Sequence, residues 1–326
     1  MGVVKRVLFL LSLLVVGCAS DAASRNDDDG NIGGGGGGGT EDVPLEPGPM
    51  RLVTWNCHDF FDATKGNCEG CYGYEEVLSK NAYQDKLNKV ARVLSRLDGD
   101  IVVLQEVENI GILNALASHI DLKTMGYEYR RLEVGNDGRG INIGFMSRVP
   151  FESYKSNKTM EFTREDSAGK VYRFARDAVE VRLKYRGHRI GIIGVHFKSR
   201  FNDNDPDRRI AEAQRVRKIA DGMKASDPEM YVFIIGDMND TPDTEAYRAV
   251  IYGWDGEGVE YKAAMDTVPE AERYSYVYRG EQLLIDHVVS DPDGSGRLVG
   301  GTATILHDIA EDASDHFPLA ATYMVP

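Results

Sequence analysis

The 326-residue chain has little cysteine and a deficit of positive charge, and each shortage excludes a class of protein. Four cysteines are too few for the dense disulfide framework of a small secreted scaffold. Its 52 acidic residues outnumber 38 basic ones, and the formal net charge of −14 argues against a general cationic clamp on nucleic acid. An acidic protein can still handle phosphates through a bound cation, which its carboxylates recruit. With 42% hydrophobic and 28% charged residues, the chain is typical of a soluble globular enzyme.

The N-terminus is typical of an export signal. Lys5 and Arg6 precede an apolar run at residues 7–16 that is too short to span a bilayer as a helix. The run leads into Val-Val-Gly before Cys18, which resembles the lipobox of bacterial lipoproteins. We therefore expect cleavage before Cys18, lipidation of that cysteine, and an extracytoplasmic protein anchored to the bacterial membrane. That membrane is the outer one if the host is Gram-negative; an ordinary signal peptide with an incidental cysteine is the alternative.

The composition divides the chain into three parts. After the signal peptide at residues 1–17, residues 18–49 contain an unbroken glycine run at 33–39 and three prolines, which predicts a flexible tether. Residues 50–326 show neither an internal repeat nor a second linker of this kind. We expect one folded domain over 50–326, and a monomer.

Hydrophobic patterning predicts alternating strands and helices, and hence an α/β fold. Apolar residues at helical spacing predict helices at 80–97, 109–119 and 207–223. β-Branched runs predict strands at 51–55, 101–104, 141–146, 178–183, 189–195, 231–235, 283–289, 300–306 and 319–324. Hairpin-like spacing between residues 171 and 195 favours mixed sheets, so we expect a layered α/β sandwich.

Polar residues gather where the predicted strands end. The segments are Thr54-Trp55-Asn56, Gln105-Glu106, His196-Phe197-Lys198-Ser199, Gly236-Asp237-Met238-Asn239, and Asp286-His287 with Ser314-Asp315-His316. Each alone has an ordinary explanation as a cap or turn. Together, in this order, they resemble the endonuclease/exonuclease/phosphatase family, typified by deoxyribonuclease I and exonuclease III. The resemblance covers nearly all of residues 50–326. It implies a four-layer sandwich of two packed mixed β-sheets flanked by helices, and divalent-metal-dependent cleavage of phosphoesters.

The residue types suit that reaction. A phosphodiester is an anion that repels an anionic nucleophile, so its cleavage needs a cation, a positioned water and a proton for the leaving oxygen. Glu106 is a hard oxygen ligand for Mg²⁺ or Mn²⁺, with Ca²⁺ as a third candidate. By resemblance, Asn56 lies in the same metal corner and Asp315 is a second carboxylate beside the metal.

Five residues are assigned to catalysis. Asp237 and Asn239 alternate across one residue, so both side chains leave the strand end on one face. The carboxylate can orient or deprotonate the attacking water, and the amide can donate to a phosphoryl oxygen. By resemblance, His316 pairs with Asp286 as a base or as an electrostatic partner of the phosphoryl group. The same resemblance makes His196 the donor of a proton to the leaving oxygen.

Substrate binding is assigned to Arg176, Lys198 and Asn239. Arg176 resembles a phosphate-contacting arginine, and a surface ion pair is its alternative. Basic residues outnumber acidic ones over 170–218, which predicts either a strip that holds a polyanion or the solvated face of a helix. One departure from the family concerns Asn142, which stands where a glutamate partner for His196 is expected.

Cys57, Cys68 and Cys71 remain after lipidation of Cys18. A disulfide among them is favoured over a metal site, because a fourth zinc ligand at suitable spacing is not evident. Cys68 with Cys71, Cys57 with Cys68, and Cys57 with Cys71 are all available pairings.

The function that these residues favour is an extracytoplasmic nuclease acting on DNA or RNA. One alternative is a phosphatase or phospholipase-type phosphodiesterase on a small or lipid phosphoester; the sequence shows no exposed aromatic hairpin for membrane contact. A second alternative is a non-catalytic surface binding module. It would require replacement of Glu106, Asp237, Asp286 or His316, and all four are present.

Overall fold

The structure is a computed structural model that describes residues 46–68, 70–72, 75–167, 169–200, 205–309 and 313–326. The predicted signal peptide, the predicted lipidation site Cys18 and most of the predicted tether lie outside these residues. Among the helices of the described ranges, none combines the length and the apolar character needed to cross a bilayer.

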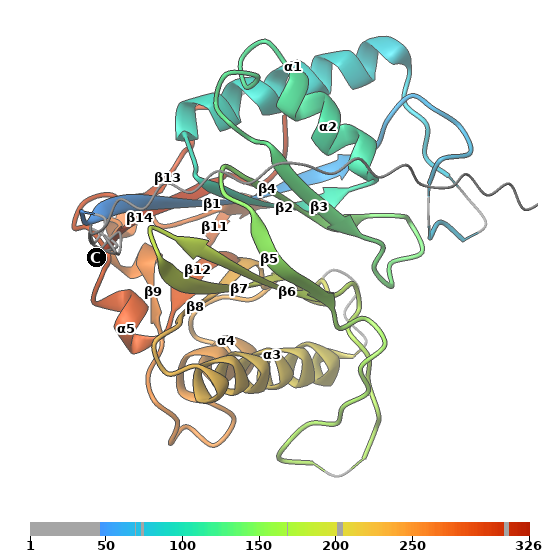
Figure 1. Ribbon diagram of the computed structural model, residues 1–326. Helices are drawn as coiled ribbons and strands as arrows, with labels where there is room; N and C mark the ends of the chain where they lie inside the picture. The colour runs from blue at the N-terminus through green and yellow to red at the C-terminus, as the bar shows by residue number, and fades with distance from the viewer. Residues whose placement is uncertain (1–45, 69, 73–74, 168, 201–204, 310–312) are drawn as a thin grey trace, which may run out of the picture. The chain divides into compact units, whose positions relative to one another are not determined.

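Two six-stranded sheets form the centre of the folded part (Figure 1). The first has the order β13-β14-β1-β2-β4-β3, with β13 Thr304–Ile305, β14 Leu319–Val325, β1 Gly48–Phe60, β2 Ile101–Val107, β4 Asn142–Ser147 and β3 Tyr129–Glu133. The second has the order β5-β6-β7-β8-β12-β9, with β5 Phe151–Ser156, β6 Ala178–Tyr185, β7 His188–His196, β8 Tyr231–Asp237, β12 Asp286–Ser290 and β9 Lys262–Ala263. A separate hairpin pairs β10 Tyr276–Tyr278 with β11 Glu281–Leu283.

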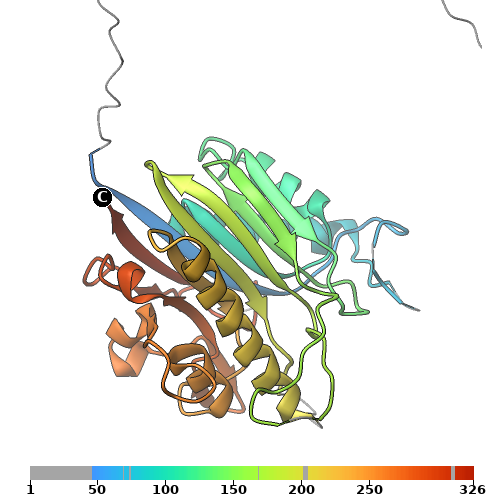
Figure 2. The same ribbon diagram turned by 60° about the horizontal axis from the view of Figure 1, so that its bottom comes forward.

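Helices cover the outer faces of both sheets, so the domain has four layers. α1 (Lys80–Leu97) and α2 (Ile110–Ser118) cover the first sheet, and α3 (Pro206–Ser226) and α4 (Glu245–Tyr252) cover the second. In Figure 2, α3 is the gold helix in front of the second sheet. Three apolar clusters fill the interfaces: one between the sheets and one under each helical layer. The shorter helical segments are α5 (Pro292–Ser295), η1 (Ala264–Thr267) and η2 (Glu270–Glu272). The predicted α/β four-layer sandwich is confirmed.

Local chemistry explains why α1 matches its predicted bounds. The Ser79 side chain accepts a hydrogen bond from the Ala82 amide and caps the N-terminus. One stripe of apolar residues, including Leu87 and Leu94, is buried against the first sheet. At the other end Asp98 adopts the left-handed conformation, with its amide donating to the Leu94 carbonyl.

Other elements differ from the prediction. β1 begins at Gly48, two residues inside the predicted tether, because Gly48 and Pro49 pair with the C-terminal strand β14. β3 and β5 were not predicted, since they lie at sheet edges with half of their side chains in solvent. The predicted strand at 283–289 is divided between β11 and β12, where the Ser275 hydroxyl accepts from the Ile285 and Asp286 amides.

Strand register brings three site residues side by side. β7 and β8 are parallel neighbours with His196 opposite Asp237, and β12 runs antiparallel to β8 with Asp286 opposite Asp237. The preceding Gly236 has φ 142°, and a Cβ there would lie 2.1 Å from the Val195 carbonyl oxygen. Only glycine therefore fits before Asp237, at the edge where the strands of both sheets end.

Candidate active site

A cleft of about 1240 Å³ opens at this edge of the sandwich. It is lined by the predicted residues Asn56, Glu106, Arg176, His196, Lys198, Asp237, Asn239, Asp315 and His316. Asp286 is fully buried and lies behind His316 instead of on the cleft surface. The structure thus brings every predicted site residue within the described chain to one place.

Asp286 and His316 form a buried pair. The Nδ1 atom of His316 lies 2.8 Å from Asp286 Oδ2. Although burial lowers the pKa of His316, the Asp286 carboxylate and then Asp237 raise it to about 10. The Trp55 indole holds the pair in place by donating to the His316 carbonyl at 2.8 Å. At neutral pH this environment favours an imidazolium with its Nε2 side toward the cleft.

Asp237 accepts hydrogen bonds from Asn239, which was predicted to lie beside it, and also from Asn56, which was predicted in the metal corner. Asn56 Nδ2 donates to its Oδ2 at 3.0 Å, and Asn239 donates through its backbone at 2.7 Å and through Nδ2 at 3.1 Å. Burial, and then the Asp286 charge, raise the pKa of Asp237 to about 7. Asn239 Nδ2 also donates to the Phe197 carbonyl, so both of its amide hydrogens are engaged. In this state Asn239 positions Asp237 and offers no spare donor to a phosphate.

His196 lies between two carboxylates. Its Nε2 atom is 3.5 Å from Asp237 Oδ2 and 3.7 Å from Glu106 Oε1. Burial, and then the Arg176 charge, hold the pKa of His196 well below its usual range, so the ring is neutral. Asn142 does not contact it: the Asn142 amide donates to the Glu108 and Gly140 carbonyls and ties its own loop.

Glu106 reaches the cleft through an unusual backbone. Its φ is +61°, a left-handed conformation that breaks the register between β2 and β4 and costs on the order of 1–3 kcal/mol. A bulge in β1 places His58 and Asp59 beside it, also at positive φ, and the Asp59 amide donates to Glu106 Oε2 at 2.8 Å. Burial, and then the Asp59 charge, raise the pKa of Glu106. His58 and Asp59 are site residues that the sequence did not indicate, because polar side chains alone do not reveal a bulge at positive φ.

The predicted metal corner suits a hard divalent cation. Glu106 and Asp59 bring two carboxylates together, and Asp315 faces the same cleft with its Oδ1 atom 3.2 Å from His58 Nδ1. A divalent cation would relieve the repulsion that raises the pKa of Glu106. Asn56 lies in this corner, but its two polar atoms already bond Asp237 and the His58 amide.

A second acidic cluster lies deeper. Among the described residues, Asp237, Asp286 and His316 offer ligand atoms within 4.8 Å of one another. His316 is cationic there and bonded to Asp286, so the trio is better suited to proton and charge transfer than to holding a cation. Glu106, outside this trio, remains the preferred metal ligand.

Arg176 forms an ion pair, but a buried one. Its Nε atom lies 3.0 Å from Asp137 Oδ2, and Nη1 donates to the Phe197 carbonyl. Asp137 also pairs with Arg139, whose Nη1 atom lies 3.5 Å from Asp59. This chain of alternating charges joins the phosphate-binding candidate Arg176 to the metal corner. No sequence feature had indicated that Asp137 and Arg139 belong to the site.

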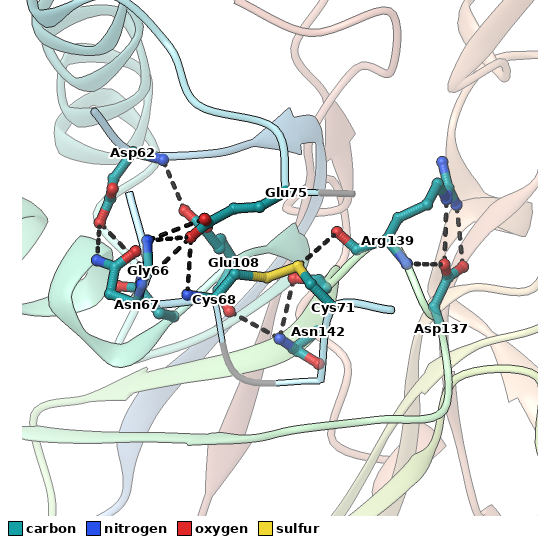
Figure 3. The surroundings of a disulfide bond; sticks show 12 residues. Asp62, Gly66, Asn67, Cys68, Cys71, Glu75, Glu108, Asp137, Arg139 and Asn142 are labelled. Carbon is teal, nitrogen blue, oxygen red and sulfur yellow. Dashed lines mark hydrogen bonds and ion pairs between the residues drawn. A yellow bond between two sulfur atoms is a disulfide. The ribbon is translucent and has the colours of Figure 1, made fainter. Parts of the chain in front are cut away.

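A half-buried disulfide supports that chain of charges. Cys68 and Cys71 are bonded, one of the three available pairings, while Cys57 is buried and free. A Cβ on Gly140 would lie 2.2 Å and 2.4 Å from the two disulfide sulfurs, so the disulfide packs on the backbone next to Arg139 (Figure 3). The disulfide loop therefore holds the loop that carries Asp137 and Arg139.

The cations of α3 are mostly engaged within the protein. Arg209 bonds Asp240, Arg217 bonds carbonyls at the end of α4, and Arg215 and Lys218 pair with Glu165. Arg208, at the start of the same helix, lines the cleft instead, together with Arg176, Lys198 and Arg200 from the same basic segment. In all, the cationic side chains that line the cleft are Arg139, Arg176, Lys198, Arg200, Arg208 and Arg279.

Glu212 of α3 is a site residue that the sequence analysis missed. It is fully buried, and its two carboxylate oxygens accept from the Ala175 amide at 2.6 Å and the Lys198 amide at 2.7 Å. One side chain thus fixes both backbone segments that carry Arg176 and Lys198.

Two packed sheets with a carboxylate- and histidine-lined cleft at their strand ends define the class of α/β-sandwich phosphoesterases. Residues 71–319 match the endonuclease/exonuclease/phosphatase family. The chain belongs to this family, whose members are metal-dependent hydrolases that include nucleases, phosphodiesterases and phosphatases.

Solved structures share the fold at low sequence identity. Truncated TDP2 of Caenorhabditis elegans is 15% identical with a TM-score of 0.57, covering 85% of this chain and 98% of that one. A family protein from Bacteroides thetaiotaomicron is 13% identical with a TM-score of 0.58, covering 86% and 96%. The human Nocturnin catalytic domain is 15% identical with a TM-score of 0.58, covering 85% and 95%. No curated protein matched the sequence.

Proposed function

We propose that this protein is a phosphodiesterase that cleaves nucleic acid, DNA or RNA, outside the cytoplasm. The observation that carries the proposal is the cleft itself, in which a carboxylate corner and an acid–base cluster lie among six cationic side chains. A polyanion needs cationic contacts along its backbone on either side of the cleaved bond. A small phosphoester would need only one or two of them.

The side chains that line the cleft divide the steps of the reaction among them. Asp237, held by Asn56 and Asn239, orients the attacking water and accepts its proton. The imidazolium of His316, fixed by Asp286, stabilises the charge that develops on the phosphoryl oxygens. His196 gains a proton once the bound phosphate offsets the Arg176 charge, and it then donates that proton through Nε2 to the leaving oxygen. Arg176 and Lys198 bind the flanking phosphate.

Glu106, with Asp315 and Asn56 beside it, would hold a divalent cation, preferably Mg²⁺ or Mn²⁺, with Ca²⁺ as a third candidate. Such a cation supplies Lewis-acid charge to the phosphoryl group. Asp59 adds a further carboxylate to that corner.

The proposal is tested by measuring which class of phosphoester the protein hydrolyses. Purified protein is incubated with plasmid, RNA, sphingomyelin and bis-p-nitrophenyl phosphate, in Mg²⁺, Mn²⁺ or Ca²⁺. We expect the wild type to cleave DNA or RNA. In His316→Ala, turnover on the same substrate should fall on the order of 10²–10⁴-fold. Turnover confined to the small or lipid phosphoester would replace the nuclease with the alternative phosphodiesterase. Absence of turnover on every substrate would favour a binding module.

The membrane anchor is proposed from the sequence at residues 1–18. Cys18→Ser should move the protein from the membrane fraction to the soluble fraction without changing turnover, because the glycine-rich segment separates the cysteine from the domain. The measurement is fractionation of expressing cells followed by assay of each fraction. An unsubstituted protein that is already soluble and unlipidated would refute the anchor.

A further inference from the structure

The hairpin β10–β11 brings an aromatic surface to the cleft that the proposed chemistry leaves unused. Tyr276 and Tyr278, here named the tyrosine row, both line the cleft. The ring of Tyr276 lies 4.8 Å from the His316 ring, centroid to centroid. The ring of Tyr278 follows at 6.5 Å from Tyr276, with the two planes only 13° apart. The row therefore starts at an acid–base residue and extends outward from it.

Strand alternation gives the hairpin two different faces. Both tyrosines are half-buried on the cleft side, whereas Val277 between them points away and is 42% exposed. At the tip, the Arg279 guanidinium lies 5.1 Å from the centre of the Tyr278 ring. Within the described part of the chain, Arg279 makes no ion pair with a carboxylate. Its charge is therefore available to an anion at the outer end of the row.

We propose that the tyrosine row stacks against unpaired bases next to the cleaved phosphate, while Arg279 contacts the backbone phosphate beyond them. The substrate class is then single-stranded nucleic acid, or a strand end, and this inference rests on the proposed nuclease function. Aromatic rings stack on any base and contribute about 1–3 kcal/mol for each. In a duplex the faces of each base are covered by its neighbours, so a stacking surface selects unpaired strands.

A lipid surface fits the hairpin less well. A membrane-binding hairpin turns its large apolar side chains outward at the tip. Here the tip is Arg279 and Gly280, followed by the exposed Glu281, and the tyrosines face the cleft.

The test compares two single-stranded oligonucleotides of equal length, one with bases and one with abasic spacers around the cleaved bond. The wild-type protein should have the higher kcat/KM on the oligonucleotide with bases. Tyr278→Ala should lower the ratio of the two kcat/KM values, with bases over abasic, by about tenfold, which is the effect of one lost stack. Tyr278→Phe keeps the ring and should keep the ratio. Val277→Ala, on the other face of the same strand, is the matched control and should match the wild type.

The outcomes separate this inference from the function on which it rests. A ratio that Tyr278→Ala leaves unchanged overturns stacking while the nuclease stands. Failure of the wild type to cleave either oligonucleotide, with plasmid still cleaved, overturns the preference for unpaired strands while the nuclease stands. Failure on plasmid and RNA as well refutes the nuclease, and the stacking role fails with it. Hydrolysis of sphingomyelin–phosphatidylcholine vesicles that weakens in Tyr278→Ala, with an unchanged oligonucleotide ratio, would assign the hairpin to lipid and overturn the proposal.

Discussion

His196 shows how one residue's environment limits the chemistry available to it. Burial and Arg176 keep its ring neutral, so it can donate a hydrogen bond but holds no surplus proton in the free protein. A bound phosphate anion would oppose the Arg176 charge and favour protonation. A role at the leaving oxygen therefore depends on the substrate being present.

We expect His196→Ala to act differently on two substrates. With a nucleoside alkoxide as leaving group, which needs a proton, turnover should fall on the order of 10²–10⁴-fold. With a nitrophenolate, which leaves without one, the loss should be small. Steady-state kinetics on an oligonucleotide and on bis-p-nitrophenyl phosphate measure both losses, with His188→Gln at the start of β7 as the control. Equal losses would assign His196 to binding, and no loss would make it structural.

The limits of sequence-based prediction also show at single residues. Glu106 and Asp237 could be predicted because each follows a strong apolar strand, and strand ends meet at one edge of a sheet. His58 and Asp59 could not, because they reach the cleft through a bulge with positive φ, which polar side chains alone do not reveal. Arg139 lies in a loop whose path depends on a disulfide that the cysteine count left open.

At the scale of elements, α3 acts on the site from behind. The buried carboxylate of Glu212 joins the segment before β6 to the segment after β7, and these carry Arg176 and Lys198. The sequence could not assign this role, because a glutamate in a charged helix reads as a surface residue. Conversely, α1 was predicted correctly because its cap and its apolar stripe are both local.

Glu212→Ala should remove both bonds, lower the free energy of unfolding by about 3 kcal/mol, and raise KM for a polyanionic substrate more than it lowers kcat. Glu212→Gln keeps one acceptor oxygen, so its free energy of unfolding and its KM should lie between those of Glu212→Ala and the wild type. Urea unfolding and steady-state kinetics measure the two effects. The control is Asp207→Asn, exposed at the start of the same helix. A KM that stays unchanged in Glu212→Ala would limit Glu212 to a structural role.

At the scale of the whole molecule, burial of ionisable groups makes stability depend on pH. His287 is fully buried, with Nε2 3.1 Å from the Asp240 carbonyl and its ring against Tyr247. Burial lowers its pKa to about 4, against an ordinary value of 6.5. The fold therefore holds a neutral ring that the unfolded chain protonates. Its contribution is present above pH about 6.5 and is lost as the pH falls toward 4.

Between pH 7 and pH 5 this one group should remove about 2 kcal/mol of stability. His287→Gln can still donate to the Asp240 carbonyl but does not titrate, so its free energy of unfolding should fall less over the same range. Urea unfolding at the two pH values measures the difference. His188→Gln serves as the control. Parallel losses in the wild type and in His287→Gln would show that the acid sensitivity arises elsewhere.

We propose that the cleft cleaves phosphodiesters with a divalent cation held at Glu106. The most direct measurement is hydrolysis of bis-p-nitrophenyl phosphate and of an oligonucleotide, after chelation and after Mg²⁺ or Mn²⁺ is returned, by the wild type and by Glu106→Gln. We predict that chelation abolishes wild-type hydrolysis, that the returned cation restores it, and that Glu106→Gln recovers little at the same concentration because it lacks the anionic ligand. Full activity in excess chelator, or equal recovery in the two proteins, would contradict the claim.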